Sequence, residues 1–229
     1  MVIKSSKKHL KKYDNDRLIF HGVKFYSDGG YMPETMHMGN PAYIDGSIGG
    51  PSAYANAKAF SSAMKPWWDA GFQIHVHSNG DVGNQDTLNA LQLLQDSKPR
   101  FDHHFTVNHF GIPSTAMVFK IKALNAVVSA NITYISERAK LEYPAALGMD
   151  RTSIATRIGM LVRNGIVTSI HLDAPVSAPN PLQEAWSVVT RRDVYKDGKV
   201  WAPAEALPSS ETMMKMITIN AAYTLGVGG

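Results

Sequence analysis

The stretch Gln73-Ile-His-Val-His-Ser-Asn-Gly-Asp81 decides the fold class of this chain. Apolar and polar side chains alternate over 72–77, which predicts a β-strand, and the Ser-Asn-Gly that follows is typical of a loop. Leucines then recur at helical spacing, which predicts a helix over 84–95. A strand, a polar loop and a helix in this order form the repeating unit of parallel α/β folds.

The same unit recurs along the chain on both sides of this stretch. Further strands are predicted at 23–26, 105–109, 126–130 and 167–172, and further helices at 53–70, 114–124, 152–164, 181–192 and 210–225. Such alternation indicates a parallel sheet that is covered on both faces or closed into a barrel. Five strands are too few for a complete barrel, so the expected fold is α/β, an incomplete (β/α)₈ TIM-barrel type with about five parallel strands.

We divide the 229 residues into a basic N-terminal segment, 1–19, and one domain, 20–229, because no Gly/Ser/Pro-rich linker or internal repeat separates the rest. Hydrophobic residues make up 44% and charged residues 18%, a balance typical of a globular domain. The residues up to Arg17 include six Lys or Arg and two Asp, which accounts for the whole formal net charge of +4. We expect this segment to lie outside the core as a solvated arm that is dispensable for stability.

Composition excludes several classes of protein. The chain has no Cys, which rules out a disulfide scaffold, thiolate metal sites and cysteine nucleophiles. It contains no apolar run long enough to span a membrane, and no signal-peptide core follows the basic start, so the expected location is cytoplasmic. No stripe of basic residues interleaved with aromatic ones is present, so we expect no nucleic-acid partner.

Titratable side chains recur on the predicted strands and just after them. They are Lys24, His75, His77, His109, His171 and Asp173. Reactive groups of parallel α/β folds gather at the carboxyl ends of strands, and His with carboxylate there suits Zn or a similar divalent ion. A lone His at a strand end is more often a hydrogen-bonded structural residue, but several on successive strands favour a metal site. Lys24 stands out because an unpaired ammonium inside an apolar strand would be costly.

Five stretches also carry a family resemblance. They are Gly22-Val-Lys-Phe-Tyr-Ser-Asp-Gly29, Gln73-Ile-His-Val-His-Ser-Asn-Gly-Asp81, Val107-Asn-His109, His171-Leu-Asp-Ala-Pro-Val176 and Thr218-Ile-Asn-Ala-Ala-Tyr223. In this order they resemble the amidohydrolase superfamily, and within it the branch typified by N-substituted formamide deformylase. The resemblance covers nearly the whole chain, and it implies strands four to eight of a barrel with one or two divalent ions, Zn being expected, at its mouth.

The resemblance implies a metal set of Lys24, His77, His109 and Asp173. Lys24 matches a lysine that is often carboxylated, which turns a cation into an anionic ligand shared by two ions. His77 and His109 match the histidines of the fifth and sixth strands, and Asp173 matches the aspartate of the eighth. Asp173 is also the expected catalytic residue, which takes a proton from metal-activated water and passes it to the leaving amine. His171 falls outside the matched positions and is expected to be dispensable for metal binding.

The implied reaction is hydrolysis of a carbon–nitrogen bond other than a peptide bond, in a small amide, formamide or cyclic amide. The family carries a His-x-His pair of metal ligands on its first strand. No such pair precedes Lys24 in this chain, which favours a piece of a longer barrel. One alternative is therefore a catalytically weak metal-binding remnant, or a half-barrel that needs a partner. Another is an unrelated α/β domain with structural histidines. The exposed edges of an incomplete sheet also invite pairing, so a homo-oligomer is a further expectation.

Overall fold

The computed structural model describes residues 12–20, 22–39, 41–140, 143–195 and 198–227. Its sheet consists of five parallel strands, β1 (Gly22–Tyr26), β2 (Gln73–Ser78), β3 (Thr106–His109), β4 (Val127–Asn131) and β5 (Thr168–His171). The strands lie in the sheet in the order in which they occur in the chain. The predicted α/β fold with five parallel strands is confirmed, and each predicted strand end lies within one residue of the observed one.

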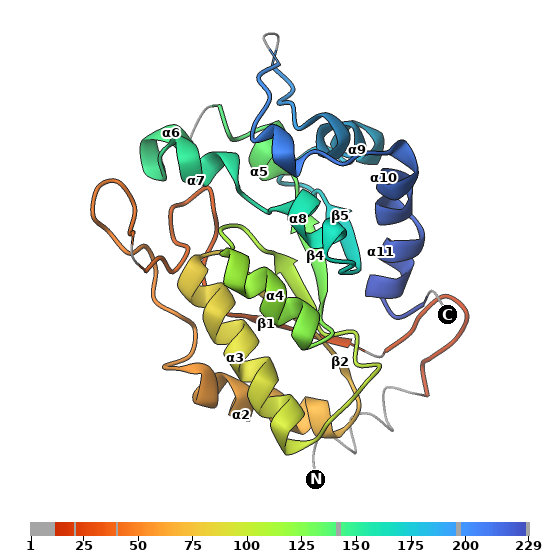
Figure 1. Ribbon diagram of the computed structural model, residues 1–229. Helices are drawn as coiled ribbons and strands as arrows, with labels where there is room; N and C mark the ends of the chain where they lie inside the picture. Colours follow the sequence, from red (N-terminus) through yellow and green to blue (C-terminus); the bar gives the residue numbers. More distant parts are fainter. Residues whose placement is uncertain (1–11, 21, 40, 141–142, 196–197, 228–229) are drawn as a thin grey trace.

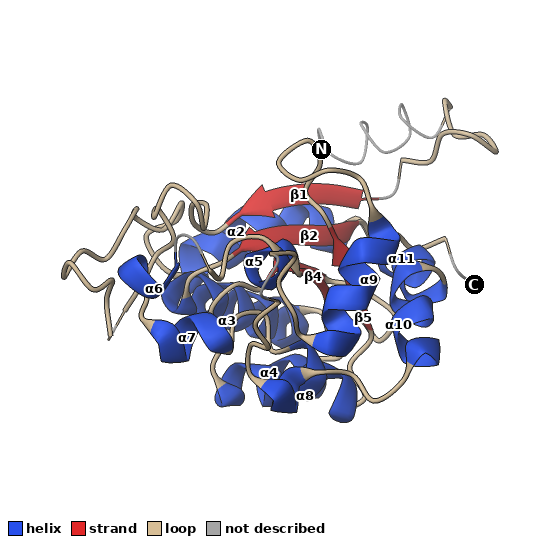
Figure 2. Cartoon of the chain, turned by 90° about the horizontal axis from the view of Figure 1, so that it is seen from above, coloured by secondary structure: helices blue, strands red, loops and turns tan. Residues whose placement is uncertain are grey.

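Helices connect the strands and follow the last one (Figure 1). The longer helices are α2 (Ala57–Asp69), α3 (Asp81–Ser97), α4 (Thr115–Ala123), α8 (Ile158–Arg163), α9 (Pro181–Thr190), α10 (Ser210–Ile217) and α11 (Ile219–Thr224). Shorter segments are α5 (Thr133–Ser136), α6 (Tyr143–Ala146), α7 (Met149–Ser153) and the 3₁₀ turn η1 (Pro203–Glu205). α2, α3 and α4 pack side by side against one face of the sheet, whereas α9, α10 and α11 pack around β5 (Figures 1 and 2).

A row of valines across the sheet explains how it is seated on the helices. Val76, Val107 and Val128 are paired in register on β2, β3 and β4, and all three are fully buried. They belong to the same core as the buried leucines of α3. Because side chains alternate along a strand, His75 and His77 lie on the opposite face of the sheet, away from this core. The carboxyl ends of the strands form the rim of the sheet, and His77 lies near it.

Two predicted helices are each divided in two. The helix predicted over 152–164 is split between α7 and α8, because Thr156 and Arg157 have left-handed backbones, with φ of 62° and 38°. The buried guanidinium of Arg191 donates to the carbonyl oxygens of Ser153 and Ala155, both at 2.9 Å, and so stabilises the break. The helix predicted over 210–225 is interrupted between α10 and α11 by residue 218, whose φ of −126° and ψ of −96° are not helical.

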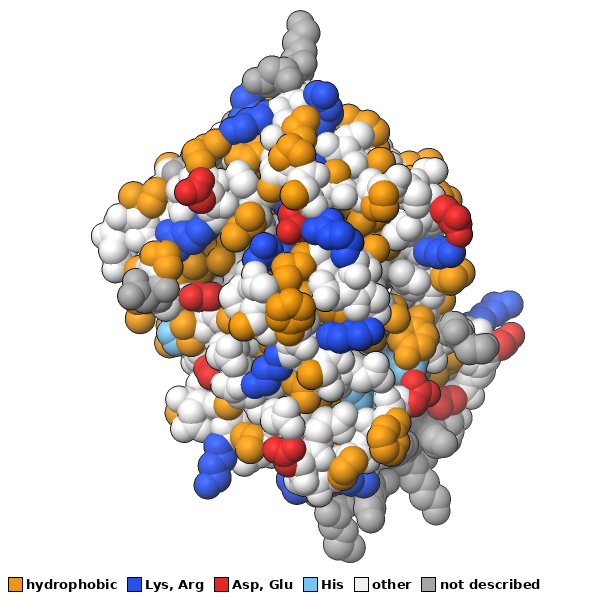
Figure 3. Space-filling model, in the orientation of Figure 1, with side chains coloured by type: hydrophobic (Ala, Val, Ile, Leu, Met, Phe, Trp, Pro, Cys, Tyr) orange, Lys and Arg blue, Asp and Glu red, His pale blue; other side chains and the backbone are white. Residues whose placement is uncertain are grey.

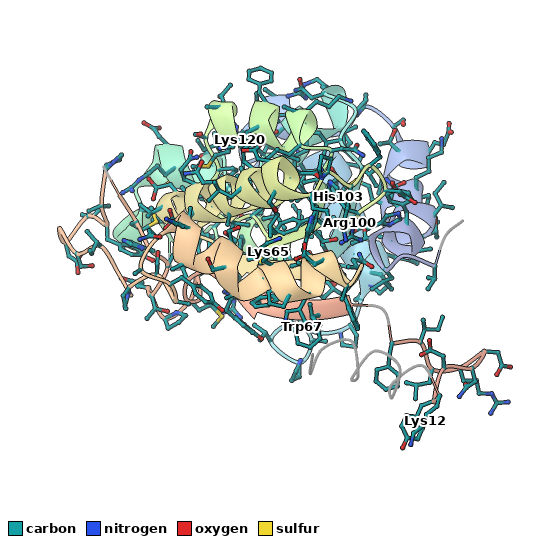
Figure 4. All side chains as sticks on the ribbon, turned by 90° about the horizontal axis from the view of Figure 1, so that it is seen from below. Lys12, Lys65, Trp67, Arg100, His103 and Lys120 are labelled. Carbon is teal, nitrogen blue, oxygen red and sulfur yellow. The ribbon has the colours of Figure 1, made fainter. Side chains whose placement is uncertain are left out.

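The amino ends of the strands are tied together by contacts that have no part in the site. Arg100, between α3 and β3, lies 4.5 Å over the ring of Trp68 and donates to the carbonyl oxygen of Phe72 at 2.8 Å. His103, which lies near Arg100 in Figure 4, pairs through Nε2 with the carbonyl oxygen of Leu124 at 3.0 Å. These contacts hold the amino-terminal end of the sheet together, at the opposite end from the candidate site.

The predicted basic segment, 1–19, falls partly outside the described residues, which begin at Lys12. Residues 12–19 are exposed, and Lys12 extends away from the sheet and helices (Figure 4). Over the described residues on the face drawn in Figure 3, basic side chains are interspersed with acidic and hydrophobic ones. Within the described part of the chain, every helix is too short or too polar to cross a bilayer.

Candidate metal centre

The carboxyl ends of β3 and β5 bring three metal-ligating side chains together. One ligand atom each from His109, His171 and Asp173 lies within 4.8 Å of the others. Nδ1 of His109 lies 3.2 Å from Nε2 of His171, and Nδ1 of His171 lies 2.9 Å from the hydroxyl oxygen of Ser129 on β4. His109 and Asp173 belong to the predicted metal set, whereas His171 was predicted to be dispensable.

The backbone at the end of β3 places the His109 ring in this group. In the sheet His109 is in register with Ser78, whose hydroxyl contacts Thr87 on α3, so a regular strand would direct residue 109 towards the helices. The φ of 72° at His109 departs from the strand conformation. Its ring lies 4.3 Å from that of His77 and 4.7 Å from that of His171, measured between centroids.

Both imidazoles are neutral near pH 7. Burial holds the pKa of His109 well below its usual value, and a proton on His171 or His77 nearby would lower it further. Burial also lowers the pKa of His171, to about 4, although the carboxylate of Asp173 opposes that shift. A neutral imidazole keeps one nitrogen lone pair, which is the form that binds a metal ion.

His77 is held by two contacts of its Nε2. This nitrogen lies 3.0 Å from the carbonyl oxygen of Gly29 and 3.1 Å from the side-chain amide nitrogen of Asn79, which also donates to Gly29 at 3.0 Å. A carbonyl oxygen can only accept and an amide nitrogen can only donate, so the Gly29 contact favours a proton on Nε2 and the Asn79 contact favours one on Nδ1. Metal-ligating histidines commonly donate their second N–H to a carbonyl, as the Gly29 contact would allow. His77 nevertheless lies outside the three-residue group, and its role as a ligand stays a prediction.

Lys24 lies on β1, in register with His75, and its side chain is exposed. Its Nζ is 5.3 Å from the ring centroid of Tyr26. The expectation that this ammonium sits in apolar surroundings is wrong, because β1 alternates between exposed and half-buried residues. Carboxylation of Lys24 and its role as a ligand stay predictions.

A cavity of about 160 Å³ opens beside these side chains. Its walls include the site residues His77, His109 and Asp173, the polar residues Asn79, Asn131, Thr133 and Arg138, and the mainly apolar residues Tyr31, Met32, Pro33, Tyr134 and Val176. A small pocket with polar groups converging at one end and apolar walls elsewhere is the usual form of a small-molecule site.

A buried carboxylate fixes the loops that line this cavity. Asp28, which follows β1, accepts backbone N–H groups from His37 at 3.0 Å, Asn79 at 3.0 Å and Gly80 at 2.7 Å. Burial raises the pKa of Asp28, and these N–H donors counteract part of that shift. A Cβ atom added at Gly83 would stand 2.6 Å from the Asp28 carboxylate, so glycine is needed for this close approach.

Sequence reasoning found the strand ends but missed three polar residues of the site. His171, Asn79 and Tyr134 are not among the predicted site residues, yet each bonds to or lies against a predicted ligand. For His171 a signal was present, because it stands two residues before Asp173 at the same strand end. Asn79 lies in the loop after β2 and Tyr134 in the short helix α5, and neither matches a ligand pattern.

Comparisons with known proteins agree with this arrangement. The sequence model of the amidohydrolase family matches residues 2–229. Over 218 residues the chain is 23% identical to YtcJ of Bacillus subtilis (strain 168), a protein assigned as an amidohydrolase, and this match covers 93% of the chain and 39% of YtcJ.

Solved structures show the same fold. Uncharacterized metal-dependent hydrolases from Pyrococcus furiosus and Pyrococcus horikoshii OT3 are 19% and 16% identical to the chain, each with a TM-score of 0.79. Each match covers 98% of this chain and 45% of the other. An adenosine deaminase from Xanthomonas campestris with bound zinc has a TM-score of 0.53 at 13% identity, over 99% of this chain and 43% of its own. The chain thus spans less than half the length of these relatives, and by the match along its sequence it belongs to the amidohydrolase family.

Proposed function

We propose that this chain carries a metal-dependent hydrolytic site that cleaves a carbon–nitrogen bond in a small amide-type substrate. The observation that carries the proposal is the convergence of His77, His109, His171 and Asp173 at the carboxyl ends of parallel strands, beside a cavity of about 160 Å³. Family membership supports the class of reaction. The sequence resemblance to N-substituted formamide deformylase favours formamides among the substrates.

The donor set fits a divalent ion of the zinc class. His77 and His109 would each supply one ring nitrogen, and Lys24, once carboxylated, would supply an oxygen; these three and a water make the usual number of ligands at catalytic zinc. An ion held there lowers the pKa of a bound water to about 7 and polarises a carbonyl group. Nitrogen and oxygen donors without thiolate are typical of catalytic rather than structural zinc sites.

Asp173 would perform the proton transfers. Its carboxylate borders the cavity and is exposed, so it can reach both an attacking water and the nitrogen of a bound amide. It would accept the proton of the water and return it to the leaving amine. The walls formed by the buried rings of Tyr31 and Tyr134 would limit the access of bulk water to the reacting bond.

A second candidate function is metal binding with little turnover. Lys24 and Tyr26 are exposed on β1, so this side of the site is wet. Water there weakens the electrostatic stabilisation of a transition state.

Zinc titration of the purified chain, followed by calorimetry, tests the proposal and assigns the ligands. We expect His77→Ala and His109→Ala to lose binding, and His171→Ala to bind about 10-fold more weakly, since it removes a hydrogen-bond partner of His109. His104→Ala is the matched control, because His104 precedes β3 and bonds to Asp102 and the carbonyl oxygen of Tyr223 instead. Loss of binding in His171→Ala with retention in His77→Ala would assign the ion to the His109–His171–Asp173 group.

Amine release from a panel of N-formyl and N-acetyl amines then separates the two functions. Turnover that disappears in Asp173→Asn supports the hydrolase. Tight zinc binding without amine release supports the second candidate. A wild-type chain that binds neither zinc, cobalt nor manganese would contradict both.

A further inference from the structure

Tyr134 forms a bridge between the short helix α5 and the loop after β2. Its hydroxyl donates to Oδ1 of Asn79 at 2.8 Å and lies 3.4 Å from Nδ1 of His109. Asn79 follows β2 and Tyr134 follows β4, so the bridge passes over the end of β3, where His109 sits.

Both ends of this bridge are anchored. The backbone N–H of Asn79 donates to Asp28 at 3.0 Å, and its side-chain amide donates to the carbonyl oxygen of Gly29 at 3.0 Å. The Tyr134 ring is 6% exposed and stacks on the ring of Tyr31, with 4.1 Å between centroids. The phenol oxygen is therefore held in place from both ends of the bridge before any ligand binds.

The direction of these hydrogen bonds follows from counting protons. A phenol has one proton, and Tyr134 gives it to Asn79, so towards His109 the oxygen can only accept. Nδ1 of His109 must then carry the ring proton if this contact is to be favourable.

We propose that Tyr134, held by Asn79, is a positioning residue that accepts the Nδ1–H of His109 and so keeps Nε2 unprotonated for a metal ion. The proposal rests on the metal site proposed above. His171 offers the same N–H a second acceptor, at 3.2 Å. If a ligand or the ion itself draws the His171 ring away, Tyr134 remains as the acceptor for a buried N–H that would otherwise be unsatisfied.

The first test uses the metal-free protein. Long-range ¹H–¹⁵N spectra of the histidine rings report which nitrogen is protonated. We expect the Nδ1–H tautomer of His109 in the wild type, and a smaller population of it in Tyr134→Phe and in Asn79→Leu. Tyr195→Phe is the matched control, since it removes a phenol that donates to the carbonyl oxygen of Glu137 at 2.8 Å. A wild-type His109 that is protonated at Nε2 would overturn the proposal.

The second test measures zinc affinity. Outer partners of metal-ligating histidines are worth about 10-fold to 100-fold in affinity, and we expect a loss of about 10-fold in Tyr134→Phe. Asn79→Leu should lose at least as much affinity as Tyr134→Phe, because it breaks the same bridge and also removes the contacts of Asn79 with Gly29 and His77. Equal losses in Tyr134→Phe and Tyr195→Phe would show a merely structural role. If the wild type binds no ion, the metal site fails, while the tautomer of His109 still decides whether Tyr134 positions it.

Discussion

The two edge strands of the sheet, β1 and β5, end at the same rim in different surroundings. β5 is covered by α9, α10 and α11, and its His171 contacts Ser129 on β4 and His109 on β3. β1 pairs with β2, and its Lys24 and Tyr26 are exposed, Tyr26 by 54%. The β5 side therefore orders its polar groups by packing and hydrogen bonds, whereas the β1 side leaves its predicted ligand in water.

The largest expected effect is on stability, and it compares the β1 edge with the interior of the sheet. Phe105, which leads into β3, is fully buried, while Phe25 on β1 is partly buried and meets Phe60 edge-on at 6.3 Å. We expect Phe105→Ala to lower the free energy of unfolding by about 3–5 kcal/mol, because it leaves a cavity in the closed core. Phe25→Ala should cost about half as much or less, since water already reaches part of that site. Urea unfolding measures both, and equal costs would show that the β1 edge is packed as tightly as the interior.

A smaller effect on stability comes from a buried carboxyl group, that of Glu184 on α9 beside β5. Glu184 on α9 is 2% exposed and receives a hydrogen bond from Ser136. Burial raises its pKa to about 7 from an unperturbed 4.5, and the nearby charge of Glu137 adds to the shift. Between these values the folded chain binds more protons than the unfolded chain, so stability should fall as pH rises from about 4.5 to 7.

Glu184→Gln should remove this pH dependence and stabilise the protein by about 1–3 kcal/mol at pH 8. Glu211→Gln is the control, because Glu211 on α10 is exposed, pairs with Lys215 and has a lowered pKa. Unfolding curves at pH 5, 6, 7 and 8 provide the measurement. An unchanged pH profile in Glu184→Gln would show that this carboxyl group does not cause the loss of stability.

The smallest expected effect is on the β1 side. Lys24→Met should change the stability of the metal-free protein by about 0.5 kcal/mol or less, because the side chain is exposed. Added bicarbonate should raise the zinc affinity of the wild type and leave that of Lys24→Met unchanged, since the variant has no amine to carboxylate. A bicarbonate effect of equal size in both proteins would remove Lys24 from the metal set.

Much of the fold was predictable from local pattern. Short apolar or alternating segments, separated by polar loops and helical patterns, predicted all five strands, because these signals are local. The break between α7 and α8 was not predictable in this way. It depends on Arg191, which lies far along the chain and supplies donors to the carbonyl oxygens of Ser153 and Ala155.

The place of the site was also predictable, because parallel strands end at a common edge and carry their polar residues there. What the sequence could not show is which groups bond across strands. The contacts of His109 with His171 and Tyr134 join residues 62 and 25 positions apart, and no local spacing encodes them. Likewise, the exposure of Lys24 depends on what lies beside β1 rather than on the residues of β1 itself.

Three backbone N–H groups donate to the carboxylate of Asp28, and this affects the order in which the rim forms during folding. They come from the loop after β1 and from the two residues between β2 and α3, and Asp28 is separated from Asn79 by 51 positions in the chain. In the unfolded chain this carboxylate is hydrated, and no neighbouring segment can offer the same donors. Closing so long a loop is repaid only when β1 pairs with β2, so loop and sheet should form in one cooperative step. Amide hydrogen exchange at His37 and Gly80 would then report the opening of the whole rim together.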